Sequence, residues 1–331
     1  NKTGSTSIQL SLWRGLKDPN WKYVRLRKPN ASNLITDAFV NRRPNPVPNR
    51  HRDVTEQAEA LAFYETALGS VRKPHALVSA ESMVGLDERG LEHLGEVSGK
   101  YASAIKAIGY IRPPKSYMES LFQQHIKVKP TSLGDLSQWL DFQARLAKFD
   151  RVFGAENVTF LKYDIGAFPD GCIVRHFCST LGIHFDGTVY RANTSVSLAG
   201  VKLLYIHRVV GADTGKLSRA LIRLLRKVSG PPFRLHSSAY ADIAAPSTAG
   251  IEWIERRASI DLNEDLTRYD DIGIRGEAEL LRPTEETKDW LARRLGDAGM
   301  PAPPMRNVED IAEGVRNLAL STDNERARQP A

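Results

Sequence analysis

The stretch of residues 105–124 constrains the fold most, because it combines a buried strand, a stop and a helix in immediate succession. Its first eight residues are mostly apolar and include β-branched side chains, which is typical of a strand covered on both faces. Two prolines end this strand, and the remaining residues have the composition of a helix. The pattern predicts an α/β fold in which Arg112 lies at the carboxyl end of a strand, where open sheets bind ligands.

A second feature is the opening segment Asn1-Lys2-Thr3-Gly4-Ser5-Thr6-Ser7, which leads directly into a predicted helix over residues 5–17. Glycine lets the backbone approach an anion, and N–H groups at a helix N-terminus point toward it. Lys2 adds a charge, and the hydroxyls add donors for phosphate or sulfate oxygens. In a nucleotide-triphosphatase loop the lysine follows the last glycine, so the order here argues against an ordinary ATPase or kinase. An ordinary helix N-cap is the alternative.

Together, the two segments resemble the sulfotransferase superfamily, whose members are P-loop-like α/β enzymes that use 3′-phosphoadenosine 5′-phosphosulfate (PAPS). Residues 2–7 match the phosphosulfate loop of that family, with Asn1 where proline is usual. Arg112, Pro114 and Ser120 match the spacing of its 3′-phosphate site. The resemblance implies a three-layer fold with a central, mostly parallel sheet flanked by helices. It also implies that the cofactor is bound by Lys2, Thr3, Gly4, Ser5, Thr6, Ser7, Arg112 and Ser120.

The segment around Glu81 narrows the resemblance to bacterial carbohydrate sulfotransferases, including lipopolysaccharide-modifying ones. Glu81 ends a predicted strand over residues 74–81, at the place where the family carries its catalytic base. The resemblance therefore implies sulfuryl transfer to a carbohydrate or glycolipid hydroxyl, with Glu81 as general base and Lys2 stabilising the leaving phosphate. A structural glutamate that caps the next helix or pairs with Lys2 or Arg112 is the alternative.

Arg191 precedes a segment that resembles an Asn-x-Ser-x-Ser segment of the bacterial branch, which implies a contact with the 3′-phosphate. The alternative is that this segment caps a helix over residues 198–210. Two other functions stay open: a P-loop kinase-like phosphotransferase, and a non-catalytic protein that binds anions or glycans. The pattern requires no metal, and no metal-binding motif is present in the sequence.

The charge of the chain bears on its partners. The formal net charge is +7 and the isoelectric point about 9.3, which indicates anionic partners. No nucleic-acid-binding motif is present, so we expect no nucleic acid partner. The basic helix predicted over residues 216–228 allows peripheral contact with an anionic membrane, although a solvated face over a core stripe explains it as well.

We expect a cytoplasmic protein. No apolar run approaches the length needed to span a bilayer, and Cys172 and Cys178 are spaced to lie on different faces of a helix as buried side chains. The strand that should precede the phosphate loop falls before residue 1, so any targeting segment is hidden from view.

We expect three parts in the chain: a nucleotide-binding core over residues 1–205, a helical part packed on it over residues 206–320, and a disordered polar tail over residues 321–331. Within the core, residues 18–52 are rich in proline, asparagine and arginine, and predict a long substrate-facing loop or a plain surface loop. The remaining predicted core elements are helices over residues 53–71, 86–103, 133–153 and 174–181, and a strand over residues 157–164.

Overall fold

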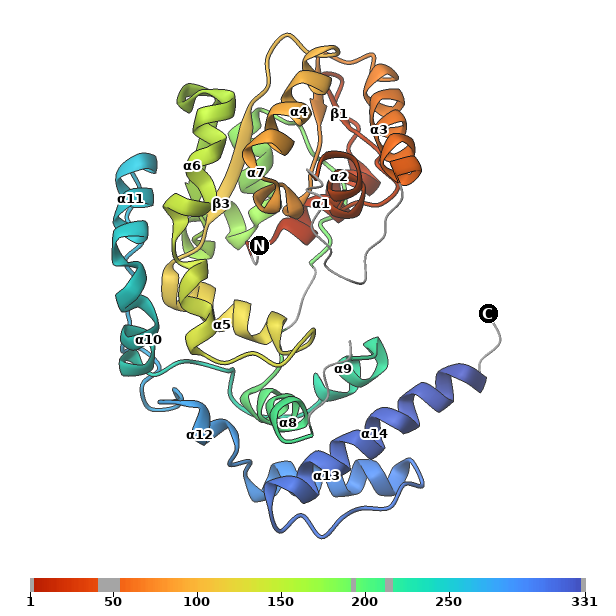
Figure 1. Cartoon of the computed structure of the whole chain (residues 1–331), viewed down its shortest axis with the longest axis vertical. Helices are drawn as coiled ribbons and strands as arrows, with labels where there is room; N and C mark the ends of the chain where they lie inside the picture. The colour runs from red at the N-terminus through yellow and green to blue at the C-terminus, as the bar shows by residue number, and fades with distance from the viewer. Residues whose placement is uncertain (1–2, 41–53, 192–194, 212–216, 329–331) are drawn as a thin grey trace. The chain divides into compact units, whose positions relative to one another are not determined.

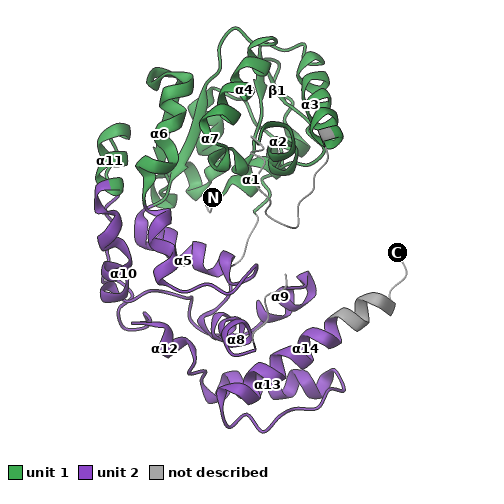
Figure 2. Cartoon of the chain, viewed as in Figure 1, with its two compact units in different colours: residues 1–112, 141–193, 250–261 green, residues 113–140, 194–249, 262–331 purple. Residues whose placement is uncertain are grey.

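A computed structural model describes residues 3–40, 54–191, 195–211 and 217–328 of the chain. The chain divides into two compact units, and each is built from segments that are distant in the sequence (Figure 2). The first unit consists of residues 1–112, 141–193 and 250–261, and the second of residues 113–140, 194–249 and 262–331. The boundary predicted at residue 205 falls inside a helix of the second unit.

The first unit is a mixed α/β structure with two short parallel sheets (Figure 1). Strands β1 and β2 pair in parallel, with Trp21 opposite His75 and Tyr23 opposite Leu77. Strands β3 and β4 pair likewise, with Ala107 opposite Val158. The elements of this unit are α1 (Ser5–Gly15), β1 (Trp21–Tyr23), α2 (Ser32–Phe39), α3 (Val54–Gly69), β2 (His75–Leu77), α4 (Glu88–Gly99), β3 (Ala107–Ile111), α6 (Phe142–Phe153), β4 (Val158–Lys162) and α7 (Ile173–Leu181).

An apolar cluster in the first unit fixes α1 in place. Ile8 and Leu12 of α1 are buried together with Ile173 and Phe177 of α7 and with Tyr23 of β1. The i, i+4 spacing of the two α1 residues puts them on one face of the helix, and burial of such side chains is worth about 1.5–3 kcal/mol each. The start of α1 is therefore held by core packing rather than by its own helix propensity.

The second unit is helical in its described part. Phe122 of α5 stacks on Phe233, with ring centroids 5.3 Å apart, and also contacts Tyr205 of α8. The elements of this unit are α5 (Pro114–His125), α8 (Leu198–Val209), α9 (Arg219–Leu225), α10 (Ser237–Ala244), α12 (Glu277–Leu280), α13 (Glu285–Asp297) and α14 (Val308–Arg328), while α11 (Thr248–Ala258) begins here and continues into the first unit.

Among the described residues, no helix has the length and apolar character required to cross a bilayer. The mixed α/β class predicted from the sequence is confirmed. The described strands form two separate pairs, so a single P-loop-like central sheet stays a prediction.

Three predicted segments differ in the structure. Residues 18–40 contain strand β1 and helix α2 instead of a loop, because α2 buries Leu34, Ile35 and Phe39 against its neighbours. The strand expected over residues 74–81 is only three residues long. Helix α14 continues to Arg328 through the segment predicted to be a disordered tail. Residues 41–53, the rest of the predicted loop, lie outside the described part.

Candidate functional site

The N-cap of helix α1 is Gly4, which has a backbone conformation that only glycine adopts readily. Gly4 has φ 71° and ψ 10°, the left-handed region, and its carbonyl accepts hydrogen bonds from the N–H groups of Ser7 and Ile8 at 2.9 and 3.2 Å. A Cβ atom at this position would lie 2.8 Å from Cγ2 of Ile173, closer than carbon atoms approach in folded proteins. Thr3, immediately before it, is buried. Backbone conformation and space therefore both select glycine here.

The first turn of α1 has the chemistry of an anion site. Gly4, at the N-cap, has no side chain to accept hydrogen bonds from the N–H groups of the turn, and the turn contains no acidic residue. A helix N-terminus carries roughly half a positive charge, which favours a phosphate or sulfate group. Thr6 and Ser7 add hydroxyls to the same turn, and the side chain of Ser7 is buried. This set fits the 5′-phosphosulfate end of PAPS.

Glu81 lies next to this turn. The Ser5 hydroxyl donates a hydrogen bond to Oε1 of Glu81, across 76 positions of sequence. Glu81 is half-buried and opens a short 3-10 helix, η1 (Glu81–Gly85), after β2. The structure thus brings together a residue of the predicted phosphosulfate loop and the predicted general base.

The segment that carries Glu81 is held on both sides. On the α1 side, Nε2 of Gln9 donates to Oγ of Ser79 at 3.0 Å. On the α2 side, the Ser82 N–H donates to Oγ of Ser32 at 3.1 Å, and Oγ of Ser82 donates to the carbonyl of Ser32 at 2.9 Å. Hydrogen bonds before and after Glu81 therefore attach its segment to α1 and to α2.

Gln9 was not among the site residues predicted from the sequence. It is 1% exposed, and Oε1 has no hydrogen-bond partner within the described residues. A buried acceptor without a donor lowers folding stability by about 1–3 kcal/mol, so packing alone does not explain a glutamine at this position. Its i, i+4 spacing from Ser5 is the sequence signal that identifies it, because the two then share the helix face directed at residues 79–81.

Arg112 lies at the carboxyl end of β3, as predicted. The residue after β4 continues the strand pairing, because the Tyr163 N–H donates to the carbonyl of Ile111, the last residue of β3, at 2.7 Å. The Arg112 guanidinium lies 5.6 Å from the ring centroid of Tyr163, within cation–π range. Burial raises the pKa of Tyr163, while the charge of Arg112 opposes that shift. Arg112 thus supplies a positive charge at this edge of the β3–β4 sheet.

The remaining predicted residues are placed differently. Ser120 lies on α5 in the second unit, whereas Arg112 belongs to the first unit. Arg191 is exposed and follows Tyr190, whose N–H donates to Oγ of Ser11 on α1 at 2.9 Å. Lys2 lies outside the described residues.

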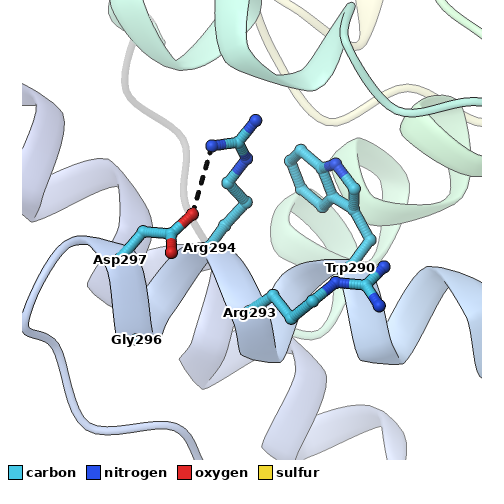
Figure 3. Close-up of a pocket in the computed structure, with 5 residues that line it drawn as sticks. All are labelled: Trp290, Arg293, Arg294, Gly296 and Asp297. Carbon is cyan, nitrogen blue, oxygen red and sulfur yellow. Dashed lines mark hydrogen bonds and ion pairs between the residues drawn. The ribbon is translucent and has the colours of Figure 1, made fainter.

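A cavity of about 350 Å³ lies in the second unit and contains none of these residues. Figure 3 shows its lining on α13, where the side chains of Trp290 and Arg294 project from the same side of the helix. Nη1 of Arg294 is 3.2 Å from Oδ2 of Asp297. The cavity is lined by residues of α13 alone and contains none of the predicted site residues, so we assign the site by the chemistry at α1 instead.

Comparisons with protein-family models, curated proteins and solved structures returned no match for this chain. Within the described ranges, no three His, Cys, Asp or Glu residues are arranged to hold a metal ion. The functional argument therefore depends on the geometry around α1.

Proposed function

We propose that the chain is a sulfotransferase that moves a sulfuryl group from PAPS to a hydroxyl of a carbohydrate or glycolipid acceptor, with Glu81 as the general base. The observation that carries this proposal is the hydrogen bond from Ser5 to Glu81. It places a carboxylate beside a helix start that has the backbone and the charge to hold an anion.

The parts of the donor suit the residues assigned to them. We assign the phosphosulfate to the first turn of α1 and to Lys2, and the 3′-phosphate to Arg112 and Arg191, which belong to the same unit. The position of Arg112 at a strand end supports its assignment, because the carboxyl edge of a parallel sheet is where such ligands bind. The assignments of Lys2 and Arg191 depend on the sequence resemblance, which is also the only ground for the prediction at Ser120.

When bound, PAPS supplies an activated sulfuryl group whose leaving group is adenosine 3′,5′-bisphosphate. Glu81 accepts the proton of the acceptor hydroxyl as the acceptor oxygen bonds to sulfur and the bond from sulfur to the phosphate oxygen breaks. Lys2 and the N–H groups of the first α1 turn stabilise the charge that develops on the departing phosphate. Positioning and charge neutralisation account for this catalysis, as in phosphoryl transfer.

The hydrogen bond from Ser5 gives Glu81 a fixed orientation. A hydroxyl that donates to one carboxylate oxygen leaves the other oxygen to accept from a substrate, since an ionised carboxylate has about four lone-pair sites. The hydrogen bonds of Ser79 and Ser82 also restrict the position of Glu81. Ser5 is therefore a positioning residue for the base in this account.

Radiolabelled sulfate transfer from PAPS to a panel of sugars and lipopolysaccharide tests the proposal. We expect Glu81→Gln to lower kcat by about a hundredfold or more, the usual contribution of a general base, while binding of adenosine 3′,5′-bisphosphate stays unchanged. Glu92→Gln, which alters an exposed glutamate on α4, is the matched control and should retain full activity.

Full transfer by Glu81→Gln would contradict the assignment of the base. Binding of the bisphosphate without transfer to any acceptor would favour a non-catalytic anion-binding or glycan-binding protein. Transfer of phosphate from ATP in the presence of magnesium would favour the kinase-like alternative.

A further inference from the structure

We propose that the basic face of α9 is a docking surface for a membrane rich in anionic lipid headgroups. This face is formed by Arg219, Arg223, Arg226 and Lys227, four exposed side chains on the helix and the turn that follows it. The proposal is independent of the sulfotransferase reaction and adds an interaction surface to the second unit.

The face is a concentration of positive charge with no ion-pair partner among the described residues. No acidic residue occurs between residues 214 and 241. Within the described part of the chain, none of the four side chains forms a salt bridge. The spacing i, i+4, i+7, i+8 puts them on one side of the helix, and a rise of about 1.5 Å per residue confines them to roughly 12 Å along its axis. Such a patch attracts an anionic surface.

The apolar side of α9 is already used inside the second unit. Leu217, Leu221, Leu225 and Val228 are buried, and α9 contacts α14. Oγ of Ser197 also donates to the carbonyl of Val228 at 2.7 Å, which ties the end of the basic segment to the start of α8. Because the leucines are buried in the core, binding to the membrane would be electrostatic: the helix would contact the headgroups and would not insert among the acyl chains.

The chemistry of the face favours headgroups over other polyanions. Residues 214–232 contain no aromatic side chain on which a base or a sugar ring could stack, and no Asn, Gln or His that could read hydrogen-bonding groups. What the segment offers is charge alone, in a compact and pre-ordered array. Anionic lipids in a bilayer present a dense surface charge that such an array meets without shape complementarity.

Vesicle sedimentation of the full chain tests the proposal. The probes are vesicles of phosphatidylcholine alone and vesicles of phosphatidylcholine with phosphatidylserine. We expect binding only to the second kind, with a partition coefficient about a thousandfold higher than that of a variant in which all four side chains are changed to glutamine. Raising the salt from 0.1 M to about 1 M should abolish binding, because the screening length falls from roughly 10 to 3 Å.

A second neutralised variant separates a local patch from net charge. Lys22, Lys28, Arg89 and Lys106 are exposed and scattered over the first unit, and changing them to glutamine removes the same four charges. This variant should bind nearly as well as the wild-type chain. Circular dichroism of both variants establishes that they are folded.

Three results would overturn the proposal. The first is equal binding to both kinds of vesicle, and the second is an equal loss of binding in the two variants. The third is dependence on the four α9 residues for retention on heparin without any binding to vesicles, which would assign the face to a soluble polyanion.

Discussion

Replacement of Gly4 by alanine tests the start of α1, on which the proposed site depends. Two costs add at this position. A residue with a Cβ in the left-handed region costs about 1–2 kcal/mol, and the φ of Gly4 is 71°. The new Cβ would also lie 2.8 Å from Cγ2 of Ile173, and overpacking of this kind costs about 1–3 kcal/mol. We expect Gly4→Ala to lower the free energy of unfolding by about 2–5 kcal/mol.

The two costs can be separated in a double-mutant cycle. Ile173→Ala removes the atom that the new Cβ meets, so the double variant should lose less stability than the sum of the single variants, by about 1–3 kcal/mol. Urea denaturation followed by circular dichroism gives the free energies of unfolding.

Gly99→Ala is the matched control. Gly99 ends α4, and a Cβ there would meet nothing within 4 Å, so we expect unchanged or slightly higher stability. A Gly4→Ala protein within about 0.5 kcal/mol of the wild-type chain would refute the left-handed start of α1, and with it the anion site.

Two further predictions concern Arg112 and the cysteines. Arg112→Ala should weaken binding of adenosine 3′,5′-bisphosphate about a hundredfold, the typical value of an arginine–phosphate contact. Arg89→Ala, which changes an exposed side chain of α4, is the control and should leave this affinity unchanged. Equal affinities of the wild-type and Arg112→Ala chains would refute the 3′-phosphate assignment. Both thiols should resist an aromatic disulfide reagent at pH 8 until the chain is unfolded, because Cys172 and Cys178 are buried and burial raises the pKa of Cys178 to about 11. Rapid labelling of either thiol in the folded protein would contradict this packing.

Local signals predicted the elements that depend on local chemistry. The two prolines after residue 112 end β3 and start α5, and Gly182 ends α7 in the left-handed conformation with φ 64°. Helix α1 begins at Ser5, as its glycine and hydroxyl-rich start indicated. These boundaries are set by proline and glycine geometry, which the sequence displays directly.

Elements that depend on tertiary contacts were not predictable in this way. The polar stretch around Trp21 forms β1 because it pairs with β2, and α2 forms because Leu34, Ile35 and Phe39 find an apolar surface. Tertiary packing overrides local composition in both cases. Ser321 and Thr322 of α14 are likewise buried, in a segment whose composition is polar.

In the candidate site, too, the residues were predictable from local sequence, whereas their contacts were not. Residue type and spacing indicated Ser5 and Glu81 separately. Their hydrogen bond could not be read from the sequence, because it depends on the connection through β1, α2 and β2. The i, i+4 spacing of Gln9 from Ser5 indicates a shared helix face, but the partner of Gln9 on that face, Ser79, is set by the tertiary fold and could not be predicted.

The most direct test of the central claim is calorimetric titration of the chain with adenosine 3′,5′-bisphosphate, ADP and ATP in the absence of magnesium. The account predicts binding of the bisphosphate at micromolar concentration, with much weaker binding of ADP and ATP, because the 3′-phosphate supplies an arginine contact that the other two lack. Preference for ATP, or no binding of any of the three nucleotides, would contradict the assignment of the α1 turn and Arg112 to a PAPS site.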